Sequence, residues 1–339
     1  MLEAYNRFVY TDVPDPVVGP EDVLVEVRAV GICGSDVHGM DGSTGRRVPP
    51  VIMGHEAAGV ISEVGPAVSG WAVGDRVTFD STIYCGDCYF CRRGLINLCD
   101  NRRVLGVSCG DYRQDGAFAE SVAVPQHILY RLPDGLSFEH AAMVEAVSIA
   151  FHAVGRTPIN LDDSAVVIGS GMIGLLVIQA LRASGCGLIV AVDLDEQRLV
   201  LAQQLGADVG LRSDTVDVVG EVAELTHGRG ADIACEVVGI TPTLDIATRC
   251  VRKGGSLTLI GNLSPKTDFL LQAAVTRELT LYGSCSSQGE YPACLNMIAR
   301  GAVDVAALIS AVVPLADGAK WFDRLYRGEP GLMKVILTP

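Results

Sequence analysis

Apolar and polar residues alternate with a period of two over residues 22–30, and this alternation is typical of a β-strand with one buried face. Two shorter runs, residues 59–65 and 74–79, predict further strands with glycine-bounded turns. Proline and glycine residues between positions 13 and 20 mark turns before the first of these strands. The first part of the chain is therefore predicted to form a small, partly open β-barrel.

The pattern changes in the second part of the chain, where a helical run begins at Ser137. From about residue 162 onward, short and almost continuous apolar runs alternate with helical stretches. The apolar runs lie at residues 165–168, 188–192, 232–237, 256–260 and 279–282. Such runs are typical of parallel strands that helices cover on both faces. The predicted fold class is therefore α/β, a partly open barrel followed by a doubly wound domain.

A glycine-rich turn with the spacing G-x-G-x-x-G follows the first apolar run of the second part. A helix is predicted directly after it, and this strand-turn-helix context is that of a dinucleotide-binding site rather than of a turn that binds nothing. Gly169 permits the tight turn, Gly171 lets the backbone approach a pyrophosphate, and Gly174 lets the helix pack on the strand. Met172 and Ile173 lie at the helix N-terminus that faces the anion.

The choice between NAD and NADP depends on the end of the next strand, where Asp193 stands. A carboxylate at this position accepts hydrogen bonds from the adenosine ribose and repels a 2′-phosphate, so NAD is the predicted cofactor. Arg198 lies close by in the sequence and keeps NADP as the alternative, because an arginine can accommodate the 2′-phosphate.

Candidate ligands for a catalytic metal occur at Cys33 and in the sequence Gly54-His55-Glu56. A thiolate, an imidazole and a carboxylate can hold Zn²⁺ and leave one tetrahedral position for water or an alcohol. A glycine-rich loop, residues 39–50, separates Cys33 from His55, so these ligands become neighbours only when the chain folds.

A second candidate metal site has four cysteines, Cys85, Cys88, Cys91 and Cys99, with the spacing C-x2-C-x2-C-x7-C. Four thiolates this close together suit a closed tetrahedral zinc site, which stabilises the fold and leaves no position for a substrate. The alternatives are free thiols in a turn and an iron–sulfur cluster.

A chain of 339 residues and 35.7 kDa is longer than one hydrophobic core usually grows, which agrees with two domains. Its formal net charge of −14 and pI near 4.8 would repel phosphate backbones and anionic lipids, so neither nucleic acid nor a membrane is a predicted partner. Neither a long apolar run nor a signal-peptide pattern occurs. The odd number of cysteines, 11, favours reduced thiols, and a cytoplasmic location is expected.

The order of these motifs resembles that of the zinc-dependent medium-chain dehydrogenases, most closely their polyol branch, which includes sorbitol, galactitol-phosphate, threonine and butanediol dehydrogenases. The segments that carry the resemblance are residues 31–38, 54–59, 85–99 and 169–174. The resemblance implies a GroES-like catalytic domain over residues 1–137 with a structural zinc lobe at 85–99, a Rossmann NAD-binding domain over 138–285, and a C-terminal completion of the catalytic domain over 286–339.

The resemblance also implies that Cys33, His55 and Glu56 hold the catalytic zinc. Glu145 is then an exchanging ligand or a partner of the bound water. The alternative for Glu145 is a simple carboxylate on a helix face, but its apolar neighbours make an unpaired charge costly there.

The family pattern assigns a proton relay to the segment after Cys33. Ser35 matches the position whose hydroxyl takes the proton of the alcohol, and His38 matches the position that passes it to solvent. An ordinary surface histidine is the alternative for His38. Asp36 resembles the carboxylate that orients the ligating imidazole, with a turn-forming aspartate as the alternative. For His152, packing beneath the cofactor and a polar role both remain open.

Two further pairs concern the substrate. Arg46 and Arg47, in the loop between the ligand segments, either clamp a phosphate or carboxylate of the substrate or form a solvated charge pair. Ser286 and Ser287 stand where sorbitol dehydrogenases carry an Arg-Tyr pair, which argues against sorbitol itself.

The predicted function is therefore transfer of a hydride from a secondary alcohol, such as a polyol, a sugar alcohol or its phosphate, to NAD, which gives a ketone. An L-threonine 3-dehydrogenase or a vicinal-diol (butanediol) dehydrogenase is the alternative among enzymes, because it would share every motif. A non-catalytic subunit that binds zinc and senses NAD is the alternative from another class. The related polyol enzymes further imply a homotetramer.

Overall fold

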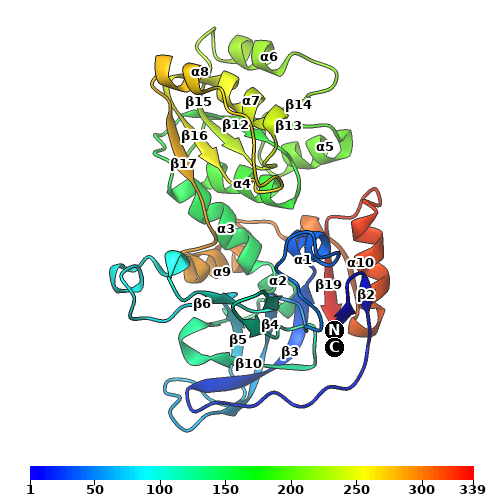
Figure 1. Cartoon of the computed structure of the whole chain (residues 1–339). Coiled ribbons are helices and arrows are strands. Elements are labelled where there is room, and N and C mark those ends of the chain that lie inside the picture. Colours follow the sequence, from blue (N-terminus) through cyan, green and yellow to red (C-terminus); the bar gives the residue numbers. More distant parts are fainter. The chain divides into compact units, whose positions relative to one another are not determined.

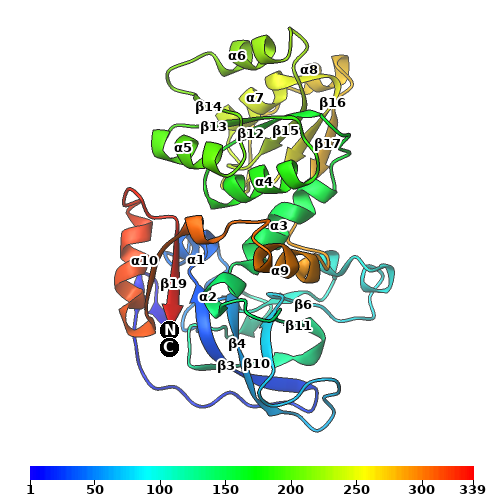
Figure 2. The same ribbon diagram turned by 180° about the vertical axis from the view of Figure 1, so that it is seen from behind.

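The computed structural model describes all 339 residues, and the chain divides into two compact units. Unit 1 comprises Met1–Glu145 and Tyr291–Pro339, and unit 2 comprises Ala146–Glu290. Helix α3 (Val144–Gly155) leads the chain into unit 2, and helix α9 (Tyr291–Ala299) begins where the chain returns to unit 1. Figures 1 and 2 show the two units from opposite sides. Unit 1 is thus built from two separate segments of the sequence.

Unit 1 is organised around a seven-stranded sheet with the order β11-β5-β4-β3-β19-β18, and β10 pairs with β3 off this path. Its strands are β3 (Asp22–Gly31), β4 (Glu56–Val64), β5 (Arg76–Phe79), β10 (Ser121–Pro125), β11 (Leu129–Arg131), β18 (Ile309–Pro314) and β19 (Lys334–Thr338). All neighbours are antiparallel except β18 and β19. The predicted strand at residues 22–30 is confirmed as β3, whose alternating burial follows its alternating polarity.

The smaller elements of unit 1 surround this sheet. They are the strands β1 (Leu2–Ala4), β2 (Arg7–Phe8), β6 (Thr82–Ile83), β7 (Arg103–Val104), β8 (Val107–Ser108) and β9 (Arg113–Gln114), and the helices α1 (Gly34–Gly39), α2 (Phe138–Ala141) and α10 (Gly318–Tyr326). Single 3₁₀ turns lie at Cys91–Arg93, Ile96–Leu98, Gln126–Ile128, Ala306–Leu308 and Leu315–Asp317. The helical run predicted from Ser137 is divided into α2 and α3 by a short turn.

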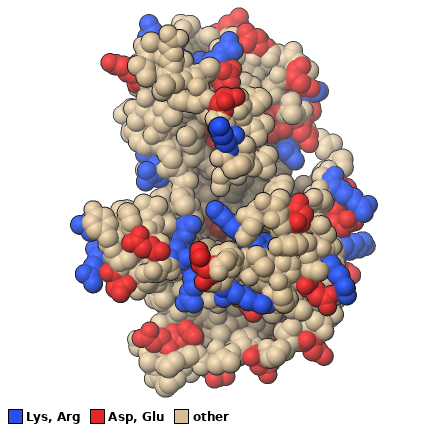
Figure 3. Space-filling model, in the orientation of Figure 1, with Lys and Arg blue, Asp and Glu red and all other residues tan.

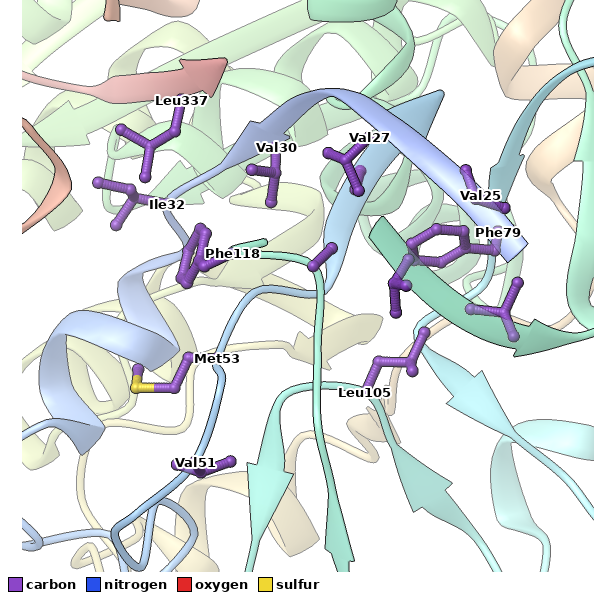
Figure 4. Packing of buried hydrophobic residues seen from close by; sticks show 14 of the residues in the cluster. Val25, Val27, Val30, Ile32, Val51, Met53, Phe79, Leu105, Phe118 and Leu337 are labelled. Atoms are coloured by element: carbon purple, nitrogen blue, oxygen red, sulfur yellow. The ribbon is translucent and has the colours of Figure 1, made fainter. Parts of the chain in front are cut away.

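The core of unit 1 joins its two sequence segments. Figure 4 shows Ile32, which follows β3, Met53, which precedes β4, and Leu337 of β19 in one apolar cluster with Phe118. Ile32, Met53 and Leu337 are at most 2% exposed. Because Ile32 and Met53 stand directly before Cys33 and Gly54, this packing fixes the backbone that carries the candidate zinc ligands.

Unit 2 contains a six-stranded parallel sheet with the order β14-β13-β12-β15-β16-β17. Its strands are β12 (Ser164–Ile168), β13 (Leu188–Asp193), β14 (Val209–Arg212), β15 (Ala231–Glu236), β16 (Val251–Leu259) and β17 (Thr280–Gly283). Its remaining helices are α4 (Met172–Ala183), α5 (Glu196–Gln204), α6 (Val218–Leu225), α7 (Thr241–Cys250) and α8 (Leu271–Thr276). Figures 1 and 2 show α4 on one face of the sheet and α6 and α7 on the other. The predicted doubly wound fold is confirmed.

The surface of the protein carries charges of both signs. Figure 3 shows Lys and Arg interspersed with Asp and Glu on the visible face, without a continuous basic surface. None of the helices combines the length and the apolar character that crossing a membrane requires.

Candidate active site and metal centres

The first candidate metal centre forms where β3 and β4 run side by side. Gly31 of β3 pairs with Glu56 of β4, so Cys33, just beyond β3, lies next to His55, just before β4. One ligand atom from each of Cys33, His55 and Glu56 lies within 4.8 Å of the others. Gly54 has a φ of +97°, and a Cβ there would lie 2.8 Å from the backbone nitrogen of Phe118. The turn that presents His55 therefore requires glycine.

The three donors fit a zinc ion. His55 and Glu56 are 4% and 1% exposed, and Nδ1 of His55 and Oε1 of Glu56 have no hydrogen-bond partner. Burial opposes protonation of His55, but the negative groups Asp36 and Cys33 outweigh it and raise the pKa of His55 well above its usual range. The centre therefore attracts positive charge. The unpaired Oε1 of Glu56 is compatible with metal ligation, whereas Nδ1 of His55 faces Asp36, which leaves Nε2 as the candidate ligand atom of His55.

A buried lysine from β19 contacts the same centre. Nζ of Lys334 lies 2.5 Å from Oε2 of Glu56 and donates to the carbonyl of Ile32 at 3.0 Å. Both charged side chains are at most 1% exposed. This ion pair was not predictable from local sequence, because its partners are 278 positions apart. The sequence feature that could have indicated a buried cation is the lysine directly before the apolar run Val335-Ile336-Leu337.

Glu145 lies near the centre but outside the group of three close ligand atoms. Its side chain is buried, and Oε1 accepts a hydrogen bond from Ser81 at 3.5 Å. Burial raises the pKa of Glu145 to about 7, while the positive charges of His55 and Lys334 act in the opposite direction. Glu145 is therefore held in the low-dielectric surroundings of the centre, within electrostatic reach of its ligands.

The candidate relay residues lie on α1, for which Cys33 is the N-cap. Ser35 and His38 are exposed, and the Ser35 hydroxyl donates to Sγ of Cys33 at 3.3 Å. Asp36 is fully buried, and its Oδ1 lies 3.5 Å from Nδ1 of His55. This helix thus places a hydroxyl beside one candidate ligand and a carboxylate beside another.

Arg46 and Arg47 differ in their burial and in their contacts. Arg46 is exposed, whereas Arg47 is 4% exposed and forms an ion pair with Asp36 at 2.7 Å. The interpretation of both as a solvated charge pair is therefore wrong for Arg47. The same contact commits the guanidinium of Arg47 to a protein carboxylate, so it does not act as a free clamp for a substrate anion.

The four cysteines of the second centre converge as well. One ligand atom from each of Cys85, Cys88, Cys91 and Cys99 lies within 4.8 Å of the others, and Sγ of Cys85 is 3.5 Å from Sγ of Cys99. A tetrahedral zinc site with Zn–S bonds of about 2.3 Å separates its sulfur atoms by roughly 3.8 Å, whereas a disulfide needs about 2.05 Å. The donor set fits zinc.

The pKa values of these thiols reflect how close together they lie. Backbone N–H groups, that of Cys91 first, lower the pKa of the Cys88 thiol to about 6. Burial, together with the neighbouring thiols Cys88, Cys99 and Cys85, raises the pKa of Cys91 to about 12. Thiolates this close repel one another unless a metal ion lies between them.

The glycine-rich turn lies between β12 and α4, as predicted. Gly169 has a φ of +99°, and a Cβ on Gly174 would lie 2.9 Å from the carbonyl carbon of Gly169. A Cβ on Gly171 would meet no atom within 4 Å, so the space above this residue is open. Met172 and Ile173 begin α4, whose N-terminus faces this space. The turn has room for a pyrophosphate where the helix favours an anion.

Asp193 ends β13 beside this turn. Its Oδ2 accepts from the backbone nitrogen of Ser170 at 2.7 Å, and its Oδ1 accepts from those of Leu194 and Asp195 at 2.8 and 3.0 Å. Arg198 is 43% exposed and lies 3.9 Å from Asp193. These bonds fix the carboxylate at the edge of the candidate nucleotide site.

His152 makes a polar contact in unit 2. Its Nδ1 lies 2.7 Å from Oε1 of Glu290, and the side chain of His152 is 4% exposed. Burial opposes ionisation of Glu290, but hydrogen bonds from His152 and from backbone nitrogens outweigh it and lower the pKa of this carboxyl. The contact holds α3 against the end of unit 2, where the chain returns to unit 1 after Glu290.

The chain is similar to dehydrogenases over almost its whole length. The family models "Alcohol dehydrogenase GroES-like domain" and "Zinc-binding dehydrogenase" match residues 19–134 and 173–300. L-idonate 5-dehydrogenase of Vitis vinifera is 37% identical over 302 residues, which cover 87% of this chain and 81% of the relative. Sorbitol dehydrogenase of Halalkalibacterium halodurans is 34% identical over 338 residues, with 98% and 96% covered. The solved structure of a zinc-binding dehydrogenase from Sinorhizobium meliloti 1021, bound to NADP, has a TM-score of 0.91, 31% identity, and coverage of 100% and 98%.

Proposed function

The chain belongs to the zinc-dependent medium-chain dehydrogenases, in their polyol branch, and we propose that it oxidises a secondary alcohol of an open-chain polyol or sugar acid. It is a zinc-dependent oxidoreductase that transfers a hydride from a secondary alcohol of a polyol to a nicotinamide dinucleotide, which leaves a ketone. The substrates of the relatives, L-idonate and sorbitol, support an open-chain polyol or sugar acid as the alcohol.

One observation carries the assignment of the reacting centre. A thiol, an imidazole and a carboxylate from Cys33, His55 and Glu56 converge within 4.8 Å, which leaves one tetrahedral position for the substrate hydroxyl. When bound there, zinc acts as a Lewis acid that lowers the pKa of the hydroxyl. Cys85, Cys88, Cys91 and Cys99 hold a second, structural zinc.

The proton of the alcohol leaves through α1 in this proposal. Ser35, whose hydroxyl lies 3.3 Å from Sγ of Cys33, takes the proton of the alcohol and gives up its own hydroxyl proton in the same step. His38, exposed one turn further along α1, passes it to solvent. Glu145, which is buried near the three ligand residues, would serve as an exchanging ligand of the zinc or as a hydrogen-bond acceptor for water or alcohol held there.

NAD is the proposed cofactor rather than NADP. The turn from Gly169 through Gly171, Met172 and Ile173 to Gly174 binds the pyrophosphate. Asp193 is fixed by three backbone hydrogen bonds and repels a 2′-phosphate. Arg198 is held beside Asp193 and Asp195 and does not offset both carboxylates.

The proposal is tested by NADH absorbance with zinc-loaded protein across sorbitol, L-idonate, sugar-alcohol phosphates, L-threonine and butane-2,3-diol. We expect turnover of a polyol, a sugar acid or a polyol phosphate, and loss of turnover in Cys33→Ser with NAD binding retained. Turnover of threonine or butanediol alone would favour the alternative enzymes. An inactive protein that binds two zinc ions and NAD would favour the non-catalytic sensor.

We propose a homotetramer in the cytoplasm. The related polyol enzymes support a homotetramer, which light scattering of the purified protein would measure. All 11 cysteines are free of disulfides, which supports a reducing compartment such as the cytoplasm.

A further inference from the structure

Arg47 places a buried guanidinium beside the catalytic centre. Its Nε and Nη2 both donate to Oδ1 of Asp36, at 3.1 and 2.7 Å, and its Nη1 donates to the carbonyl of Arg46 at 3.0 Å. Nη2 also lies 3.4 Å from Oγ of Ser35. All three nitrogen atoms of the side chain therefore have partners, and two of these partners lie on α1.

The carboxylate that Arg47 holds also faces a zinc ligand. Oδ1 of Asp36, the atom that receives both bonds from Arg47, lies 3.5 Å from Nδ1 of His55. The other oxygen of Asp36 has no hydrogen-bond partner. Arg47 is therefore the hydrogen-bond donor that holds the shared oxygen of Asp36 where it meets His55.

The fold makes room for this arrangement. A Cβ on Gly39 would lie 2.7 Å from Cγ of Arg47, so a larger residue at position 39 would displace the arginine. The backbone on either side of Arg47 is anchored to Ser108, whose nitrogen donates to Arg46 at 3.2 Å and whose carbonyl accepts from Val48 at 3.0 Å. These two backbone hydrogen bonds hold the loop on both sides of Arg47 and thereby position its guanidinium.

We propose that Arg47 is a positioning residue for the dehydrogenase reaction, which fixes Asp36 against the zinc ligand His55 and orients the hydroxyl of Ser35. The proposal rests on the proposed function, because it assigns Arg47 to the same centre. A carboxylate that is hydrogen-bonded to a ligating imidazole sets the orientation of the ring, and its loss commonly costs about 10- to 100-fold in metal affinity or activity. Arg47 acts one contact further out, through Asp36.

The test compares Arg47→Met and Arg47→Lys with the matched control Arg46→Met, since Arg46 is the exposed neighbour. The first readout is retention of the catalytic metal against a chelator, and the second is the visible spectrum of protein with Co²⁺ at this centre. We expect Arg47→Met to retain the metal about 10- to 100-fold more weakly and to change the spectrum. Arg47→Lys keeps the charge but not the planar fork, so it should recover only part of the loss. Arg46→Met should match the wild type.

An Arg47→Met variant with wild-type metal retention and an unchanged Co²⁺ spectrum would overturn the proposal, whatever its turnover. If Arg47→Met does not fold, the double variant Asp36→Asn/Arg47→Met removes both buried charges together, and wild-type metal retention in that variant would overturn the proposal equally. Both readouts are independent of the substrate. A wild type that oxidises no alcohol would refute the proposed function, while the metal measurements would still decide the role of Arg47.

Discussion

Replacement of Lys334 by Met should destabilise unit 1 strongly. The ammonium group is 2.5 Å from Glu56, and the two side chains are 1% and 0% exposed, so the variant leaves a buried carboxylate without its cation. Removal of one partner of a buried ion pair typically costs about 3–5 kcal/mol. With an m-value of roughly 2 kcal/mol/M in urea, the unfolding midpoint should fall by about 1.5–2.5 M.

Urea unfolding followed by tryptophan fluorescence measures this loss selectively. The chain has two tryptophans, Trp71 and Trp321, and both belong to unit 1. The measurement should use protein freed of zinc, so that no other cation replaces Lys334 beside Glu56. The matched control is Glu56→Gln/Lys334→Met, which we expect within about 1 kcal/mol of the wild type, because replacement of both charges is often nearly neutral.

A fall of less than about 0.5 M in the midpoint of Lys334→Met would refute this reasoning, since it corresponds to only about 1 kcal/mol. Addition of zinc extends the test. If the loss in Lys334→Met becomes smaller with zinc bound, the carboxylate of Glu56 has accepted the metal in place of the lysine. An unchanged loss would show that Glu56 depends on Lys334 in both states.

Three further predictions follow from the other sites. Cys88→Ser should lower the zinc content measured by mass spectrometry from two ions to one per chain, and a content of two would contradict the closed four-cysteine centre. Asp193→Ser should raise kcat/KM with NADP relative to NAD, and an unchanged ratio would show that another group sets the preference. Burial opposes ionisation of Asp232, but hydrogen bonds from Arg252 and Ser164 lower its pKa to about 2. Because this folded-state pKa is depressed, the stabilisation is complete above about pH 4 and is lost toward pH 2, and calorimetry should show a smaller acid-induced fall in Tm for Asp232→Asn.

The strands of both units were predictable where burial depends on local pattern. The run at residues 188–192 corresponds to β13, and that at 165–168 to β12, because strands covered on both faces are apolar throughout. Strand β14 was missed, because it is an edge strand of four residues, Val-Gly-Leu-Arg, without an apolar run. Its place in the sheet follows from pairing with β13 and not from its own composition.

The donors of the candidate centres could be named from the sequence, since few residue types bind zinc and their spacing was distinctive. The cations around them could not be named. Arg46 and Arg47 are identical in type and adjacent, yet only Arg47 is buried, because the loop turns that side chain toward Asp36. Lys334 acquires its role from the pairing of β19 with β3, which no local pattern encodes.

The distance in sequence between Glu56 and Lys334 has a consequence during synthesis. A ribosome that adds about 5–20 residues per second needs roughly 15–55 s to make the 278 positions between them. All of Ala146–Glu290 is made within that interval, so the nucleotide-binding unit can fold while the catalytic centre still lacks its buried cation. A nascent chain thus passes through a stage in which it has the features to bind a nucleotide but not the complete centre, and chaperones have this interval in which to shield the unfinished sheet.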